Sequence, residues 1–317
     1  AMNANKSFVL LLLMLFGSAV CASDAEKQRE LRLAAGIGDV ETIDRLLDQG
    51  TDVNSANSVG KTALMMAIEN DNMEATALLL ARGADVNATT LAGCTALTFA
   101  AENGHDALTA LLLERGADIS ATTRGGWSAL MIAARYGLPD MVDQLLYKNA
   151  DPNQQDKEGR TALIYTAERN HPQTAVMLLK GGANTEIREN HGATALIVAA
   201  DRGNAEMVDV LLAHGADIEA KDQDGATALI WAVGQNKYAA AERLIKHGAN
   251  VNHQDNDGVS ALMEAASVRS AELVKLLLQN GADANLSDNN GRTAAEIAKK
   301  KRNKEVDALL KSAGIKQ

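Results

Sequence analysis

Apolar and polar residues alternate along this chain in a helical pattern that itself recurs every 33 residues. Within residues 194–212, an apolar run over 195–200 is followed by a polar turn and then by apolar residues in 207–212. Their spacing places these apolar residues on one face of a helix. Gly215, which follows, is a typical helix-terminating residue. The pattern therefore predicts two short helices in each recurring unit, joined by a turn.

A short motif marks the start of each unit: Gly, a variable residue, Thr or Ser, then Ala and usually Leu. Glycine permits a tight turn, and the hydroxyl of Thr or Ser can cap the helix that follows. We expect seven full units over 57–287, an N-terminal capping repeat over 23–56 and a shortened C-terminal capping repeat over 288–317. The motif begins at Gly60, Gly93, Gly126, Gly159, Gly192, Gly225, Gly258 and Gly291.

Other marks recur in register with this motif. An alanine follows the first apolar residues, as at Ala199, a Leu-Leu pair lies in the second helix at 211–212, and Gly-Ala-Asp follows at 215–217. With the period of 33, these marks resemble the ankyrin repeat over roughly 31–317. The resemblance implies an all-α ankyrin-repeat solenoid of helix-turn-helix units with β-turn finger loops. The chain has Ala where the family prefers Pro and lacks the family's signature His, but neither departure changes the predicted fold.

The N-terminal segment predicts export. One lysine precedes the apolar run 8–20, which is too short to span a bilayer comfortably, and small residues follow it. We expect a signal peptide over 1–22, cleaved after Ala22, with Ala1 interpreted as a residue left by cloning. The alternatives are a buried N-terminal helix or a lipoprotein lipidated on Cys21, although the preceding residues 18–20 fit a lipoprotein signal poorly.

The composition narrows the partner classes. The formal net charge of −10 does not favour non-specific binding to nucleic acid or anionic lipid. The basic run 299–304 is therefore interpreted as the solvated face of the terminal unit. Two glycosylation sequons, at Asn87 and Asn285, fall inside predicted loops where a glycan would be awkward. The position of these sequons favours a bacterial periplasmic location over a eukaryotic secretory route.

No catalytic constellation stands out. His105 and His171 share one unit position, where the family often places a His that braces the turn, and the aspartates at 85 and 118 share another. A catalytic group is needed once, so recurrence indicates a structural role. The lone Cys94 offers no disulfide and no metal-ligand spacing. We expect no enzymatic activity, no metal and no cofactor.

The resemblance implies a protein-binding concave surface, formed by the turn tips and the exposed side of the first helices. Trp127 and Tyr136 are predicted to form an aromatic anchor there, with arginines around them that could pair with a partner's carboxylates. The alternative is that Glu158, Glu168 and Asp201 neutralise these arginines within the array. Tyr165 and Trp231 are interpreted as core residues. The candidate partner-binding residues are Arg124, Trp127, Arg135, Tyr136, Lys157, Arg160, Arg169, Arg188, His191 and Arg202.

The sequence thus predicts a non-enzymatic protein-binding scaffold in the periplasm. Its partner is expected to be another exported protein, such as a toxin or an enzyme, which it would inhibit or protect. The alternative is a structural or assembly protein of the cell envelope that acts by self-association or lipid anchoring. Nucleic acid is not an expected partner, and a membrane is one only if Cys21 is lipidated.

Overall fold

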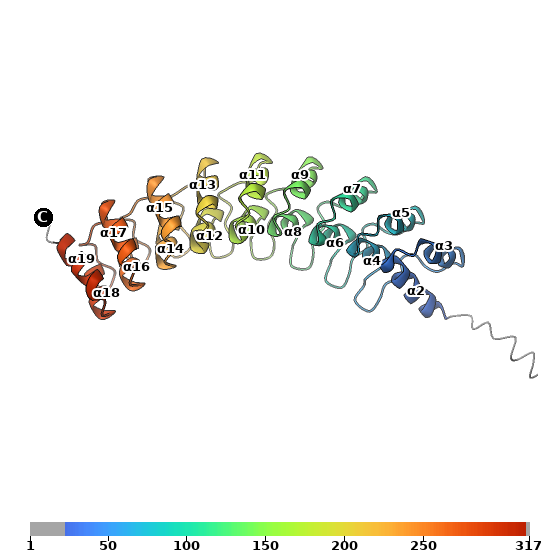
Figure 1. Cartoon of the computed structure of the whole chain (residues 1–317), viewed down its shortest axis with the longest axis horizontal. Helices are drawn as coiled ribbons and strands as arrows, with labels where there is room; N and C mark the ends of the chain where they lie inside the picture. The colour runs from blue at the N-terminus through green and yellow to red at the C-terminus, as the bar shows by residue number, and fades with distance from the viewer. Residues whose placement is uncertain (1–22, 315–317) are drawn as a thin grey trace, which may run out of the picture.

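The computed structural model describes residues 23–314, and these residues form 18 α-helices. Extended pairing within this range is limited to isolated bridges at the bases of the loops, such as Thr122 with Ser128. The helices follow one another in pairs along a curved array (Figure 1). The all-helical solenoid predicted from the sequence is confirmed. The predicted signal peptide, 1–22, lies outside the described residues.

The first helix of each pair lies on the inner, concave side of the arc, together with the loops (Figure 1). The second helix lies on the outer side. The first helices are α2 (Asp24–Ile37), α4 (Ala63–Glu69), α6 (Ala96–Asn103), α8 (Ala129–Arg135), α10 (Ala162–Arg169), α12 (Ala195–Arg202), α14 (Ala228–Gly234), α16 (Ala261–Ser267) and α18 (Ala294–Lys300). The second helices are α3 (Val40–Asp48), α5 (Met73–Ala81), α7 (Asp106–Glu114), α9 (Pro139–Tyr147), α11 (Pro172–Lys180), α13 (Ala205–Ala213), α15 (Tyr238–Lys246), α17 (Ala271–Gln279) and α19 (Lys304–Gly314).

Small apolar residues hold neighbouring units together. Each first helix packs against the first helix of the next unit and against its own second helix, as α10 does against α12 and α11. Alanine at the first helical position has no side chain beyond Cβ, so the helices can approach closely. This explains how a chain with only 3% aromatic residues builds a continuous core. The alanine at the first helical position is buried in each of the eight units after the N-terminal one: Ala63, Ala96, Ala129, Ala162, Ala195, Ala228, Ala261 and Ala294.

The predicted helix caps are present. The Thr161 hydroxyl accepts a hydrogen bond from the backbone N–H of Ile164 at 3.3 Å, which satisfies one of the free donors at the start of α10. Ser and Thr residues cap the corresponding helices of the other units in the same way. Thr227 differs, because its side chain makes no cap hydrogen bond to α14.

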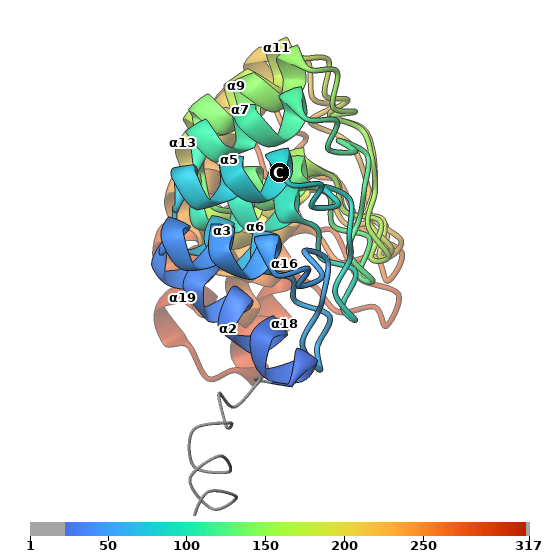
Figure 2. The same ribbon diagram turned by 90° about the vertical axis from the view of Figure 1, so that its right-hand side faces the viewer.

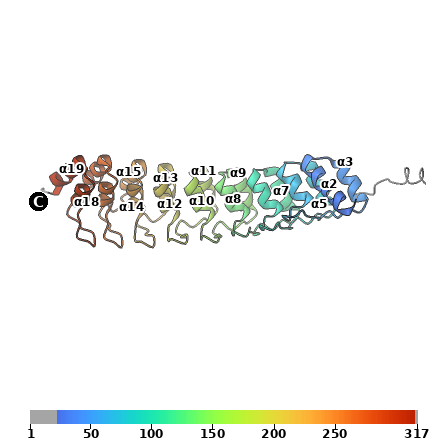
Figure 3. The same cartoon turned by 90° about the horizontal axis from the view of Figure 1, so that it is seen from below.

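The loops between units form a regular ladder. Within one loop, the backbone N–H of Asp156 donates to the carbonyl of Arg160 at 3.0 Å, and Gly159 takes a φ of 76°. Residues other than glycine rarely adopt this positive φ, and a Cβ at Gly159 would lie 3.1 Å from the backbone nitrogen of Asn190, so the turn favours glycine. The next loop is tied on by the N–H of Asn190, which donates to the carbonyl of Glu158 at 2.9 Å. All loops therefore project to the same side of the helices (Figures 2 and 3).

The histidine expected to brace the turn also joins neighbouring units. The ring Nε2 of His171 lies 3.0 Å from the carbonyl oxygen of Arg135 in the preceding unit, and His105 contacts the carbonyl of Glu69 in the equivalent way. In the next unit Asn204 stands in the place of His171, and its side-chain amide donates to the backbone carbonyl of Ala167 at 2.8 Å. These bonds satisfy carbonyls at the ends of first helices and fix the spacing of the units.

Candidate functional site

The concave face divides into seven cells, each built by two neighbouring units. Counting from the first residue of each 33-residue unit, a cell comprises the fifth and thirteenth residues of one unit and the tenth residue of the next. The fifth residue follows the turn glycine, and the other two lie on consecutive first helices. The cells are numbered 1 to 7 by their fifth-position residues, which are Lys61, Cys94, Trp127, Arg160, Ala193, Ala226 and Val259.

Cell 3 is filled by an aromatic pair and an arginine. The rings of Trp127 and Tyr165 lie 4.9 Å apart, and the guanidinium of Arg135 lies 4.9 Å from the Trp127 ring and 5.7 Å from the Tyr165 ring. Both contacts are cation–π interactions within the chain. Tyr165 is buried, as predicted, and its hydroxyl donates to Asp156. Burial and this hydrogen bond raise the pKa of Tyr165, so the phenol stays protonated and keeps donating.

Cell 4 is filled by ion pairs. The guanidinium of Arg160 lies 3.3 Å from a carboxylate oxygen of Glu168 and 3.3 Å from one of Glu158. The same Glu168 carboxylate lies 3.2 Å from Arg202, whose guanidinium is 3.8 Å from Asp201. The three acidic residues considered as internal partners are therefore the ones that these arginines contact. Two of the candidate arginines are at least partly satisfied within the array.

The other candidate residues lie around these two cells. His191 is exposed and approaches Glu189 at 3.0 Å, and Arg188 donates to the loop carbonyl of Gly192 at 3.0 Å. Tyr136 is half exposed at the end of α8. The structure thus brings Trp127, Arg135, Arg160 and Arg202 together as one ladder. Of the candidate cations, four are exposed and have no ion-pair partner within residues 23–314: Arg124, Lys157, Arg169 and Arg188.

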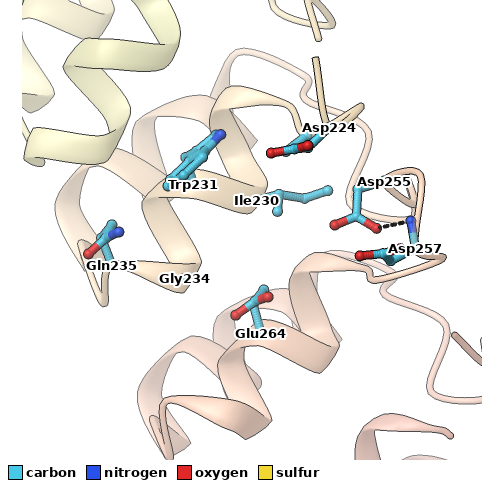
Figure 4. A pocket seen from close by; sticks show the side chains of 9 residues that line it. Asp224, Ile230, Trp231, Gly234, Gln235, Asp255, Asp257 and Glu264 are labelled. Carbon is cyan, nitrogen blue, oxygen red and sulfur yellow. Dashed lines mark hydrogen bonds between the residues drawn. The ribbon is translucent and has the colours of Figure 1, made fainter. Parts of the chain in front are cut away.

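Cells 5, 6 and 7 are open. Cell 6 is a cavity of about 370 Å³ between α14, α16 and two loops (Figure 4). Cell 5 holds a cavity of about 190 Å³ beside Ala193 and Trp231, and cell 7 one of about 280 Å³ beside Val259 and Ile297. The residues that line cell 6 are Asp224, Ala226, Ile230, Trp231, Gly234, Gln235, Asp255, Asp257 and Glu264.

Small side chains explain why these cells are open. The fifth position shrinks from Lys, Trp or Arg in cells 1, 3 and 4 to Ala193, Ala226 and Val259 in cells 5 to 7. In cell 6 the thirteenth residue is Gly234, and a Cβ there would meet Glu264 no closer than 3.5 Å. The interpretation of Trp231 as a core residue therefore needs correction. Its indole is only partly buried, because the alanines beside it are too short to cover it.

Cell 6 also differs in its charge. Its wall carries carboxylates from two loops and from α16 (Figure 4). One oxygen of Asp255 accepts backbone N–H bonds from Asp257 at 2.9 Å and Val259 at 2.8 Å, but no side chain in the described part of the chain donates to the other oxygen. Burial raises the pKa of Glu264, with a further contribution from the nearby Asp255. The cavity thus gathers four carboxylates with no basic side chain among its lining residues, and the nearby Lys301 opposes the rise in the pKa of Glu264.

Asp255 is the first residue of its 33-residue unit, and the carboxylates at the same place in other units have a side-chain donor that Asp255 lacks. The second oxygen of Asp222 accepts from the indole N–H of Trp231 at 2.7 Å, and that of Asp288 accepts from Arg292 at 2.9 Å. In Asp255's own unit, the residue that corresponds to Trp231 is Glu264, which donates no such bond. Sequence reasoning missed this cell, because a small residue such as Ala226 carries no chemical signal until the unit positions that share a cell are known.

Comparison with protein families decides the identity of the array. A family model described as ankyrin repeats (3 copies) matches residues 1–90, 31–123, 130–222, 186–255 and 229–317. The chain belongs to the ankyrin repeat family. A search of curated proteins gives no match. Ankyrin repeats generally mediate binding to other proteins and generally serve as non-catalytic scaffolds.

Two properties of the ankyrin array bear on other kinds of site. Between Ser23 and Gly314, no group of His, Cys, Asp or Glu side chains is arranged to hold a metal ion. Over the same residues, every helix is too short or too polar to cross a bilayer.

Proposed function

We propose that this ankyrin-repeat protein is a periplasmic scaffold without enzymatic activity that binds another exported protein through its concave face. The observation that carries this proposal is the row of cells on one continuous surface. Cells 3 and 4 present aromatic and arginine side chains, and cells 5 to 7 present cavities beside them. Interfaces gain most of their binding energy from such anchors and from pockets that receive a partner's side chains.

The location rests on the N-terminal pattern. The apolar run followed by small residues is typical of a signal peptide, and the bound protein would then also be exported. Binding would inhibit a toxin or an enzyme, or protect an exported protein from damage. To test export, the full chain is produced in a Gram-negative host and the N-terminus of the periplasmic product is read by mass spectrometry. We expect it to begin at Ser23. A lipid on Cys21 would instead favour the envelope-anchored alternative.

The binding surface is tested by comparing proteins captured from a periplasmic extract by the mature chain and its variants. The double variant Trp127→Ala with Tyr136→Ala removes the aromatic residues of unit 3 from the concave face. We expect it to lose a protein that the unmodified chain captures. Tyr147→Ala is the matched control, because Tyr147 lies at the end of the outer helix α9 and is 82% exposed. Equal capture by the folded double variant would argue against this part of the surface.

A further inference from the structure

A cation of the chain itself occupies each of the closed cells, which are cells 1, 3 and 4. In cell 1, the ammonium of Lys61 lies 4.9 Å from the centre of the Phe99 ring and 2.8 Å from a carboxylate oxygen of Glu69. Arg135 occupies cell 3 and Arg160 occupies cell 4. Each cation lies against an aromatic ring or a carboxylate contributed by the same or the adjoining unit. The array therefore shows, three times, what kind of group this geometry accommodates.

Cell 6 has the same architecture without an internal cation. The positions that supply the cation elsewhere are Ala226 and Gly234, and none of the nine lining residues is basic. Trp231 and Ile230 provide an apolar wall, and the carboxylates stand at the rim on the loops and on α16 (Figure 4). An aromatic wall combined with carboxylates suits a cation on an apolar stem.

We propose that cell 6 receives an arginine side chain from the protein that the concave face binds. This inference rests on the proposed function and specifies the chemistry of its partner. The cavity of about 370 Å³ is large enough to enclose a complete side chain. A guanidinium can bond both to the free oxygen of Asp255 and to Glu264, and its planar face can lie along Trp231. The partner therefore presents an exposed arginine within a basic surface.

The chain has only two tryptophans, and this makes the inference directly testable. Their indole N–H signals are resolved by NMR, and Trp231→Phe assigns them. The probe is N-acetyl-arginine methylamide, and its neutral isostere, the citrulline analogue, is the control ligand. We expect the Trp231 signal to shift with an affinity of about millimolar, as befits a single side chain. The Trp127 signal should stay in place, because Arg135 already occupies cell 3.

Two variants locate the probe. Gly234→Arg places an internal guanidinium where Arg135 lies in cell 3, and should abolish the Trp231 shift. The double variant Asp255→Asn with Asp257→Asn should weaken the probe about tenfold, since it removes charge-assisted hydrogen bonds. Glu114→Gln with Asp143→Asn changes the net charge equally on exposed residues of the outer helices α7 and α9, and should leave the affinity unchanged.

Several outcomes would overturn the inference. They are an absent Trp231 shift, an equal response to the citrulline analogue, and an equal loss of affinity in the outer-helix control. A native NMR spectrum of each variant without the probe excludes misfolding as the cause. The proposed function is judged separately by partner capture. If Gly234→Arg captures the partner as well as the unmodified chain does, the scaffold proposal stands and the arginine site is wrong.

Discussion

Two parts of the concave face, cells 1, 3 and 4 and cells 5 to 7, use one backbone geometry in opposite ways. In cells 1, 3 and 4 the variable positions are filled by long side chains that contact one another, such as Arg135 between Trp127 and Tyr165. In cells 5 to 7 the fifth residue is short and cavities remain. Variable positions of a repeat can therefore either complete the surface internally or leave it open for another molecule. Exposed aromatic and basic residues alone do not distinguish the two.

The test with the largest expected effect compares two residues at the tenth unit position. Tyr165 contributes to the closed cell 3, and Trp231 lies beside the open cells 5 and 6. Tyr165→Ala should lower the free energy of unfolding by about 3–5 kcal/mol, because it removes a buried ring that closes cell 3. Trp231→Ala should lower it by only about 1–2 kcal/mol, because the indole is partly exposed and mainly loses its bond to Asp222. Urea unfolding followed by circular dichroism measures both. Equal losses would contradict the difference between the closed and the open cells.

A second test concerns the ion pairs of cell 4. Glu168→Gln should lower the free energy of unfolding by about 1–2 kcal/mol, because this mostly buried carboxylate serves both Arg160 and Arg202. Glu102→Gln is the matched control. Glu102 holds the same unit position in cell 2, but it is exposed and has no ion pair within the described array. Its replacement should change stability by less than about 0.5 kcal/mol. Equal changes in the free energy of unfolding at both sites would mean that the ion pairs of cell 4 do not stabilise the protein.

The sequence could predict the fold because its determinants are local and repeated. Gly159, Thr161 and Ala162 act within their own turn and helix, so their roles follow from spacing and backbone preference. The closed cells were predicted only in part. Trp127 and the arginines were recognised by residue type, but their partners could not be chosen without knowing which residue of the next unit faces them.

The open cells were harder still to predict. A cavity consists of missing side-chain volume, and Ala226 or Gly234 carries no chemical signal by itself. The significance of these small residues appears only when Glu264, thirty residues beyond Gly234, is seen to share their cell. The unit positions that make up a cell must therefore be known before the sequence can be searched for one.

The third test fills the cavity of cell 6 with a side chain of the protein itself. Gly234 ends α14 without a positive φ, so a side chain fits there without backbone strain. Gly234→Arg should raise the free energy of unfolding by about 1 kcal/mol, because it replaces glycine in a helix, places a cation near the helix C-terminus and faces Glu264. Gly234→Ala separates the helix contribution from the charge. If both variants gain equally in thermal unfolding, the carboxylates of cell 6 do not attract a cation, and the comparison with cell 3 fails.

The smallest expected effect is a pH dependence that arises from the Glu264 carboxylate of cell 6. Burial, and secondarily Asp255, raise the pKa of Glu264 in the folded state, while Lys301 on the α18 side acts in the opposite direction. A raised folded pKa means that the folded chain holds this proton more tightly than the unfolded chain, so stability is lost as the pH rises through the folded pKa. Glu264→Gln should therefore stabilise the protein at neutral pH and have little effect below the ordinary pKa of a glutamate. In a Gly234→Arg background the same replacement should lose its stabilising effect, because the ionised carboxylate then has a partner. The contrary outcome is that Glu264→Gln changes stability with the same pH dependence in both backgrounds. An arginine in cell 6 would then not contact Glu264, and the open cell would not hold a cation as the closed cells do.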